Sequence, residues 1–160
     1  GKLPDAGVKD ILFDIGSALK FCHDVGVAHL DVKCDNIFSV VTTTRRFKLG
    51  DFGTAHFLLD GKLPVPFDGL GSGDARYLSK ESLTNRVTDI PKIDIFALGA
   101  TALECLSGKD LPADGEEWHK LRDGRSIREY LQSRPCAGSV VGHESLKQHS
   151  SRRASVALHR

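Results

Sequence analysis

The sequence predicts an α+β fold that is mainly helical. Two segments carry helical apolar patterns, and two short strand-like segments are separated by a polar turn. With 160 residues, 40% of them hydrophobic, the chain is long enough to bury a sizeable core. Its formal net charge of +1 gives no general case for nucleic acid or an acidic membrane as a partner. No apolar run reaches membrane-spanning length, so we expect no membrane span.

The first helix is expected over residues 5–25, where apolar residues recur at three- and four-residue steps. Asp5, directly after a proline, is a suitable N-cap, and Gly26 is expected to end the helix. The following segment, 27–36, is too polar and irregular to predict a regular element.

Two short strands are predicted next, over 37–41 and 47–49, joined by a turn over 42–46. The stretch 57–73 contains six Gly and Pro residues and predicts a long loop. Loops of that length within a compact domain are usually functional.

Residues 92–107 are the most apolar segment of the chain and are apolar nearly all round a helix. This pattern predicts a central buried helix that ends at Gly108. A shorter helix carrying Trp118 is expected over 116–122.

Composition divides the chain into 1–124 and 125–160. The second part has seven Arg and Lys residues against two acidic ones and is rich in serine, whereas the first part has fewer basic than acidic residues. We expect 125–160 to be either a degenerate helical end or a disordered tail. The four cysteines are widely spaced with no C-x-x-C pair, which favours reduced thiols in an intracellular protein.

The clearest chemical pattern is H-L-D-V-K-C-D-N at 29–36, followed by D-F-G at 51–53. If the intervening strand pair returns the chain, Asp51 can lie beside Asp31, Lys33 and Asn36. Two carboxylates, an amide and an ammonium group around one small volume suit a metal-bound polyphosphate, because oxygen ligands hold Mg²⁺ and a cation faces phosphate.

The order and spacing of these motifs resemble the catalytic core of the eukaryotic protein kinases. The resemblance implies that Asp31 is the catalytic aspartate, which accepts the proton of the substrate hydroxyl. It places Lys33 near the transferred phosphate and Asn36 and Asp51 at the two magnesium-binding positions, so that these three residues bind ATP and Mg²⁺. Gly53 is expected to permit the backbone turn beside the metal.

Three further positions have structural roles by the same resemblance. His29 matches a packing and hydrogen-bonding residue, and Asp94 matches a buried aspartate that braces the catalytic loop from the central helix. Glu81, in Y-L-S-K-E, keeps the glutamate of a kinase A-P-E triplet, although the two preceding residues differ. Its expected partner is Arg152 or Arg153, in R-R-A-S, a stretch that equally suits a phosphorylation site at Ser155.

Within the kinases the chain is most similar to the Wee and Myt group of cell-cycle inhibitory kinases. The similarity rests on H-L-D-V-K, on G-D-A-R-Y at 73–77, on D-I-F-A-L-G, and on L-P-A-D-G-E-E-W-H-K-L-R-D-G at 111–124. It implies phosphorylation of a tyrosine, with threonine as a second candidate, on a cyclin-dependent kinase. Leu30 replaces the arginine that usually reads a phosphorylated activation loop. Lys33 alone would favour serine/threonine specificity, so the substrate residue stays open.

The resemblance implies a protein-kinase-like fold, here mainly the helical C-terminal lobe with a short catalytic-loop hairpin. No glycine-rich loop precedes Pro4, so we expect the N-terminal lobe to be absent and residues 1–124 to form a partial kinase domain. Such a lobe alone should bind nucleotide weakly. The absence of methionine agrees with a chain that begins elsewhere.

Two functions remain open at this point: an active Wee-like kinase, or a catalytically silent kinase-like module that serves as a protein-interaction scaffold. The intact set of Asp31, Lys33, Asn36 and Asp51 favours catalysis, and the altered S-K-E favours the silent module. The expected partner is a protein substrate, with a cyclin-dependent kinase as candidate and no nucleic acid. The expected location is the nucleus or the cytoplasm.

Overall fold

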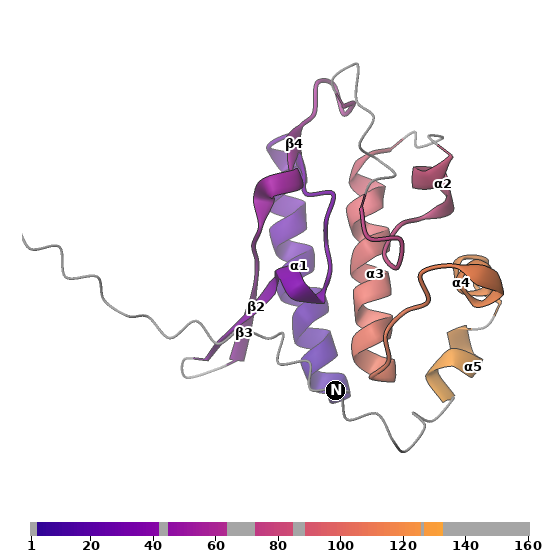
Figure 1. The fold of residues 1–160 in the computed structure, drawn as a ribbon. Coiled ribbons are helices and arrows are strands. Elements are labelled where there is room, and N and C mark those ends of the chain that lie inside the picture. Colours follow the sequence, from indigo (N-terminus) through magenta and orange to yellow (C-terminus); the bar gives the residue numbers. More distant parts are fainter. Residues whose placement is uncertain (1–2, 42–44, 64–72, 85–88, 126, 133–160) are drawn as a thin grey trace, which may run out of the picture.

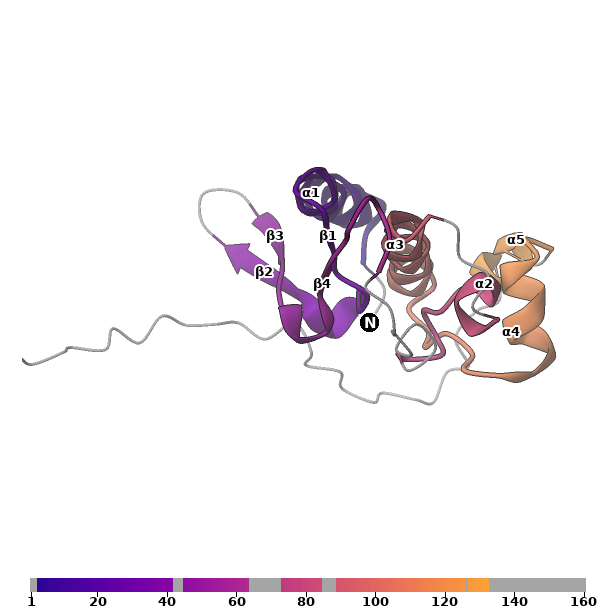
Figure 2. The same cartoon turned by 90° about the horizontal axis from the view of Figure 1, so that it is seen from above.

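The computed structural model describes residues 3–41, 45–63, 73–84, 89–125 and 127–132. Two long helices, α1 (Asp5–Asp24) and α3 (Pro91–Ser107), lie side by side at the centre (Figures 1 and 2). The hairpin of β2 and β3 lies on the α1 side, whereas α2, α4 and α5 lie on the α3 side. The predicted mixed fold, dominated by two helices, is confirmed in this arrangement.

The core forms where α1 and α3 meet, because the helical spacing of their apolar residues turns one face of each helix toward the other. On α1 the side chains of Ile15 and Leu19 are completely buried. On α3 the buried residues include the apolar Ala97 and Leu98 and also the polar Asp94 and Thr101. The outer face of α3 is less covered than its composition predicts, since Ile95 is 46% exposed.

The ends of both long helices agree closely with the prediction, with one exception. Gly26 follows α1 and Gly108 follows α3, both with positive φ values that glycine adopts without strain. Asp5, however, is the first helical residue and not the N-cap, because Pro4 occupies the cap position and its carbonyl already accepts the Val8 N–H. The Asp5 carboxylate still favours this end through the helix dipole.

The two predicted strands form an antiparallel hairpin, β2 (Ile37–Val41) and β3 (Arg45–Leu49). Phe47 is buried, and its N–H donates to Asp14 on α1 at 2.9 Å. Arg46 also pairs with Asp14, at 3.2 Å. The central part of the expected turn, 42–44, lies outside the described residues.

The segment 27–36, predicted to be irregular, contains two short elements. The strand β1 (Val27–Ala28) pairs with β4 (His56–Phe57), and a 3₁₀ turn, η1, spans Cys34–Asn36. A second 3₁₀ turn, η2, spans Phe52–Thr54. The two-residue strands depend on a pairing between distant parts of the chain, which no local pattern reveals.

Three shorter helices complete the described part: α2 (Lys80–Leu83), α4 (Gly115–Arg122) and α5 (Ile127–Gln132). The prediction found only α4. Most of the expected loop 57–73 and most of the basic end 125–160 lie outside the described residues. None of the helices in the described ranges is long and apolar enough to cross a membrane.

Candidate functional site

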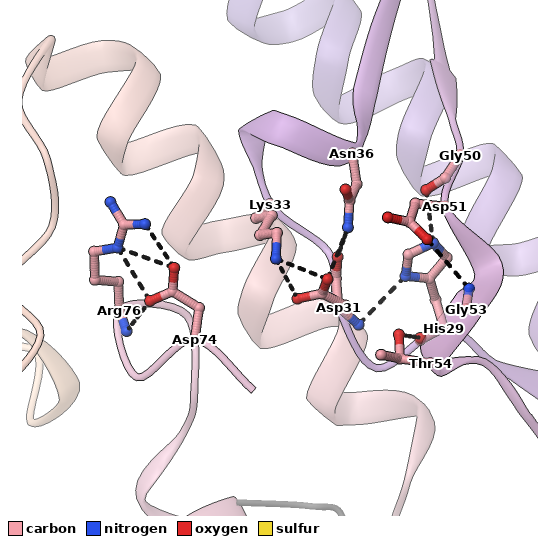
Figure 3. Close-up of polar contacts among 10 residues, drawn as sticks. All are labelled: His29, Asp31, Lys33, Asn36, Gly50, Asp51, Gly53, Thr54, Asp74 and Arg76. Carbon is pink, nitrogen blue, oxygen red and sulfur yellow. Dashed lines mark hydrogen bonds and ion pairs between the residues drawn. The ribbon is translucent and has the colours of Figure 1, made fainter. Parts of the chain in front are cut away.

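The site is built around residues His29–Asn36, hereafter the polar loop, which connects β1 to β2 (Figure 3). Asp94 on α3 anchors its first residues. This carboxylate is completely buried, and it accepts the backbone N–H groups of His29 at 2.9 Å and Leu30 at 2.7 Å. His23 Nε2 lies 2.8 Å from the same carboxylate. A buried acid on so apolar a helix requires hydrogen-bond partners. The loop N–H groups supply them, and Asp94 in turn holds the loop in place.

The anchor matters because Leu30 has a φ of 64°, a left-handed conformation that non-glycine residues rarely adopt. The two N–H bonds to Asp94 hold the backbone in this conformation. The sharp change of direction at Leu30 leads the chain from β1 into the residue that follows, Asp31.

Asp31, Lys33 and Asn36 form one hydrogen-bonded group in the middle of the polar loop (Figure 3). The Lys33 ammonium lies 2.8 and 3.0 Å from the two carboxylate oxygens of Asp31. Asn36 Nδ2 donates to the Asp31 carboxylate at 2.9 Å and to the Asp31 backbone carbonyl at 2.8 Å. Because both bonds use the amide nitrogen, the side-chain oxygen of Asn36 remains available on the other side of the amide.

His29 links the polar loop to the D-F-G segment. Its buried ring accepts the Asp31 N–H at Nδ1, at 3.3 Å, so the ring proton lies on Nε2, which donates to the Gly50 carbonyl at 3.2 Å. The ring also contacts Phe52 edge-on, with centroids 4.8 Å apart. Thr54 donates to the His29 carbonyl at 3.0 Å. Apart from the Phe52 contact, each of these bonds has a backbone group as one partner.

Asp51 is brought to the polar loop by the β2–β3 pairing. The Gly50 N–H donates to the Asn36 carbonyl at 2.9 Å, directly beyond the last paired residues of the hairpin. Asp51 itself is exposed and has a φ of 61°. Its carboxylate accepts the Gly53 N–H at 3.3 Å and so caps η2. Gly53 therefore supplies a backbone donor beside the Asp51 carboxylate.

The oxygen atoms that Asn36 and Asp51 offer are suitable ligands for a hard divalent cation. Asn36 offers an amide oxygen and Asp51 an exposed carboxylate, and Mg²⁺ takes oxygen ligands while keeping several waters. The described residues contain no group of three or more His, Cys, Asp and Glu side chains that could hold a metal alone. Two protein ligands suit a cation that is shared with phosphate oxygens.

A second acid–base pair, Asp74 and Arg76, lies beside Lys33 (Figure 3). The Arg76 guanidinium donates two hydrogen bonds to the Asp74 carboxylate, from Nη2 at 2.6 Å and from Nε at 3.0 Å. These bonds hold the pKa of Asp74 below its usual value, and the Lys33 ammonium acts in the same direction. The pair belongs to the G-D-A-R-Y motif, so the structure places this motif next to the polar loop.

The motif is held from behind by α4. The Arg122 guanidinium donates to the backbone carbonyls of Ala75 at 3.0 Å, Arg76 at 2.8 Å and Leu78 at 2.8 Å. The Trp118 indole N–H donates to the Ala75 carbonyl at 2.8 Å. The Arg122 guanidinium stacks on the Trp118 ring, with its Cζ atom 3.7 Å from the ring centroid. Burial lowers the pKa of Arg122 to about 10, so the guanidinium remains charged at neutral pH.

Sequence reasoning did not assign a role to Trp118 or Arg122, although it singled out the stretch that contains them. The available signal was their spacing. Residues four apart on a helix share one face, and a Trp-x-x-x-Arg pair on a short polar helix presents a stacked cation to its surroundings.

Tyr77 ends the motif and leads into a buried network with α3. Its hydroxyl donates to the Glu104 carboxylate, which also accepts the Cys34 thiol at 3.5 Å. Burial raises the pKa of Tyr77, and the hydrogen bond to Glu104 adds to the shift. Burial likewise raises the pKa of Glu104. The network ties G-D-A-R-Y to the polar loop through α3.

Glu81 is the one predicted site residue that lies away from this group. It is exposed on α2, whose N-cap is Ser79. The neighbouring Lys80 pairs with Asp123 at the end of α4, so α2 is attached to that helix. The arginines expected to pair with Glu81 lie outside the described residues.

Comparison with known proteins places these features in context. The family described as "Protein kinase domain" matches residues 1–154. "Wee1-like protein kinase" of Oryza sativa subsp. japonica is 40% identical over 116 residues, covering 72% of this chain and 21% of the relative. "Wee1-like protein kinase" of Arabidopsis thaliana is 38% identical over 124 residues, covering 78% and 23%.

A third relative is the "Membrane-associated tyrosine- and threonine-specific cdc2-inhibitory kinase wee-1.3" of Caenorhabditis elegans, 36% identical over 123 residues. The match covers 77% of this chain and 17% of the relative. The chain thus spans less than a quarter of the length of these three proteins.

Proposed function

The chain belongs to the protein kinase family, and from that premise we propose that it forms the C-terminal lobe of a kinase that transfers the γ-phosphate of ATP to a protein hydroxyl group. One observation carries the proposal. Asp31, Lys33 and Asn36 form a single hydrogen-bonded group, and the β2–β3 pairing brings Asp51 to the same edge. An aspartate, a lysine, an asparagine and a second aspartate in this order resemble the catalytic loop and the D-F-G motif of the protein kinases.

Asp31 would accept the proton of the substrate hydroxyl. Its carboxylate is 18% exposed, and its bonds to Lys33 and Asn36 fix its orientation. A carboxylate held in this way can orient a hydroxyl without itself moving. The Lys33 side chain is 22% exposed. Its ammonium group would attract the negatively charged phosphate that is transferred.

Asn36 and Asp51 would hold Mg²⁺, and Lys33 would contact the phosphate groups of ATP. A bound magnesium ion supplies positive charge that offsets the negative charge of the phosphates. In this family ATP lies between two lobes, so the described residues would form one wall of the nucleotide site.

We further propose a tyrosine or threonine of a cyclin-dependent kinase as the substrate residue. The support is the name of the relative from C. elegans, which describes a tyrosine- and threonine-specific inhibitory kinase, together with G-D-A-R-Y beside Lys33. Leu30 in place of an arginine agrees with a kinase that needs no phosphate on its activation segment.

The test is phosphate transfer by the complete protein to a cyclin-dependent kinase, with the labelled residue identified by mass spectrometry. Asp31→Asn should reduce the rate by about a hundredfold to ten-thousandfold. Asp35→Asn is the matched control, because Asp35 is an exposed carboxylate in the same loop.

The outcomes separate the possibilities. Full activity of Asp31→Asn would show that the site is misplaced. Labelling of serine alone would remove the Wee-like substrate assignment while leaving a kinase. No transfer by a folded wild-type protein would favour the silent interaction module.

A further inference from the structure

Two cysteine side chains meet behind the polar loop. Cys34 Sγ, in η1, lies 3.6 Å from Cys105 Sγ, on α3, although the residues are 71 positions apart. Cys34 is half-buried and Cys105 is 9% exposed. Cys22, the other described cysteine, is buried on α1. The sulfur–sulfur contact is therefore created by the packing of the polar loop on α3.

We propose that hydrogen peroxide converts Cys34 and Cys105 into a disulfide, a reversible modification that joins the polar loop covalently to α3. The two sulfurs are already in contact, and they must approach by roughly 1.5 Å to reach a bond length of about 2.05 Å. Disulfides of intracellular proteins are commonly transient and redox-sensing, which matches a pair of this kind.

The two thiols differ in their access to solvent. Cys34 is half-buried, whereas Cys105 is 9% exposed. Cys34 is therefore the thiol that peroxide reaches first, because cysteine oxidation follows access to the sulfur. Cys105 then serves as the second, resolving thiol.

The reaction balances with one peroxide molecule. The Cys34 sulfur attacks one peroxide oxygen and the O–O bond breaks, which leaves a sulfenic acid on Cys34 and a first water. The Cys105 sulfur then attacks the Cys34 sulfur and expels the hydroxyl group, which leaves as a second water. Two thiols lose two electrons and two protons, and peroxide is reduced to two waters.

The bond would act on the polar loop at a second point. Asp94 on α3 already holds the loop at His29 and Leu30, and the disulfide would hold it again at Cys34, between Lys33 and Asn36. It would also remove the thiol hydrogen that Glu104 accepts. This inference goes beyond the proposed function, because the disulfide forms whether or not the loop transfers phosphate.

Peptide mapping tests the proposal. The folded chain is treated with hydrogen peroxide, free thiols are alkylated, and the protein is digested with trypsin and analysed by mass spectrometry. Cleavage after Lys33, Arg45, Lys92 and Lys109 isolates the two cysteines on separate peptides. The expected product is 34–45 linked to 93–109, and dithiothreitol should remove it.

Variants supply the controls. Cys34→Ser and Cys105→Ser should each abolish the linked peptide, whereas Cys22→Ser should retain it. The fluorescence of Trp118, the single tryptophan, reports whether each variant is folded. If one of the serine variants fails to fold, mapping of the wild-type chain still decides the question.

Three results would overturn the proposal. The first is sulfinic or sulfonic acid on either cysteine with no linked peptide. The second is a link through Cys22 of equal abundance. The third is loss of the linked peptide in Cys22→Ser. Failure of the phosphate-transfer test leaves this result unaffected, so the two proposals can fail separately.

Discussion

The Asp94 carboxylate accepts the Leu30 N–H at 2.7 Å and so holds a leucine whose φ is 64°. One buried side chain on α3 thus fixes the direction in which the polar loop leaves β1. Its second oxygen accepts the His29 N–H and contacts His23. The position of Asp31 depends on this bond network, although Asp94 is far from it in the sequence.

Asp94→Asn should lower the free energy of unfolding by about 2–4 kcal/mol, because the amide nitrogen would face a buried donor that loses its acceptor. Urea unfolding measures the loss. Asp89→Asn, at an exposed position just before α3, is the control and should be near neutral. Equal stability of both variants would show that Asp94 is not the anchor.

Asp51→Ala in the complete protein should abolish magnesium-dependent binding of ATP, because it removes the charged ligand of the pair Asn36 and Asp51. Calorimetric titration with and without Mg²⁺ measures the effect. Asp60→Ala, at an exposed carboxylate in the turn after β4, should leave binding unchanged. Normal magnesium-dependent binding by Asp51→Ala would place the metal elsewhere.

Arg122→Lys should loosen residues 74–79 while keeping the charge. Lysine cannot reach three carbonyls with a planar fork or stack equally on Trp118, so we expect a loss of about 1–2 kcal/mol. Hydrogen exchange should accelerate in this segment. Arg125→Lys, at an exposed residue three positions after the end of α4, is the control. Unchanged exchange would contradict a supporting role for Arg122.

Asp74→Asn should destabilise the protein in a pH-dependent way. The pKa of Asp74 is lowered in the folded state, so its contribution is complete above about pH 5 and is lost as the pH falls through the folded pKa. The difference in unfolding free energy from wild type should be about 1 kcal/mol near neutral pH and should shrink as the pH falls through the folded pKa of Asp74. A difference that stays constant with pH would indicate lost packing instead.

Two glycine substitutions should have opposite signs. Gly99→Ala, on the exposed face of α3 with no neighbour within 4 Å of an added Cβ, should stabilise the protein by about 0.5–1 kcal/mol. Gly50→Ala would place its Cβ 2.6 Å from the Phe38 ring and should destabilise. Thermal unfolding measures both, and stabilisation by Gly50→Ala would show that Phe38 moves freely.

The sequence predicted α1, α3, α4 and the β2–β3 hairpin, because their apolar spacing is local and strong. It missed α2 and α5, which have four and six residues, since helices of that length depend on tertiary contacts. For α2 such a contact is the Lys80–Asp123 ion pair, whereas its Ser79 cap is local. The pairing of β1 with β4 was missed for a similar reason, because it joins distant segments.

The sequence by itself determined that the polar loop and the D-F-G segment belong to one chemical pattern. Residue type and spacing are local properties, so this could be read directly from the chain. Only the tertiary structure decided how they are held: Asp94 under Leu30, Arg122 on the carbonyls behind G-D-A-R-Y, and Cys34 against Cys105. Each of these contacts joins residues more than 40 positions apart. Their partners are chosen by the packing of helices, which leaves no periodic trace in the sequence around either residue.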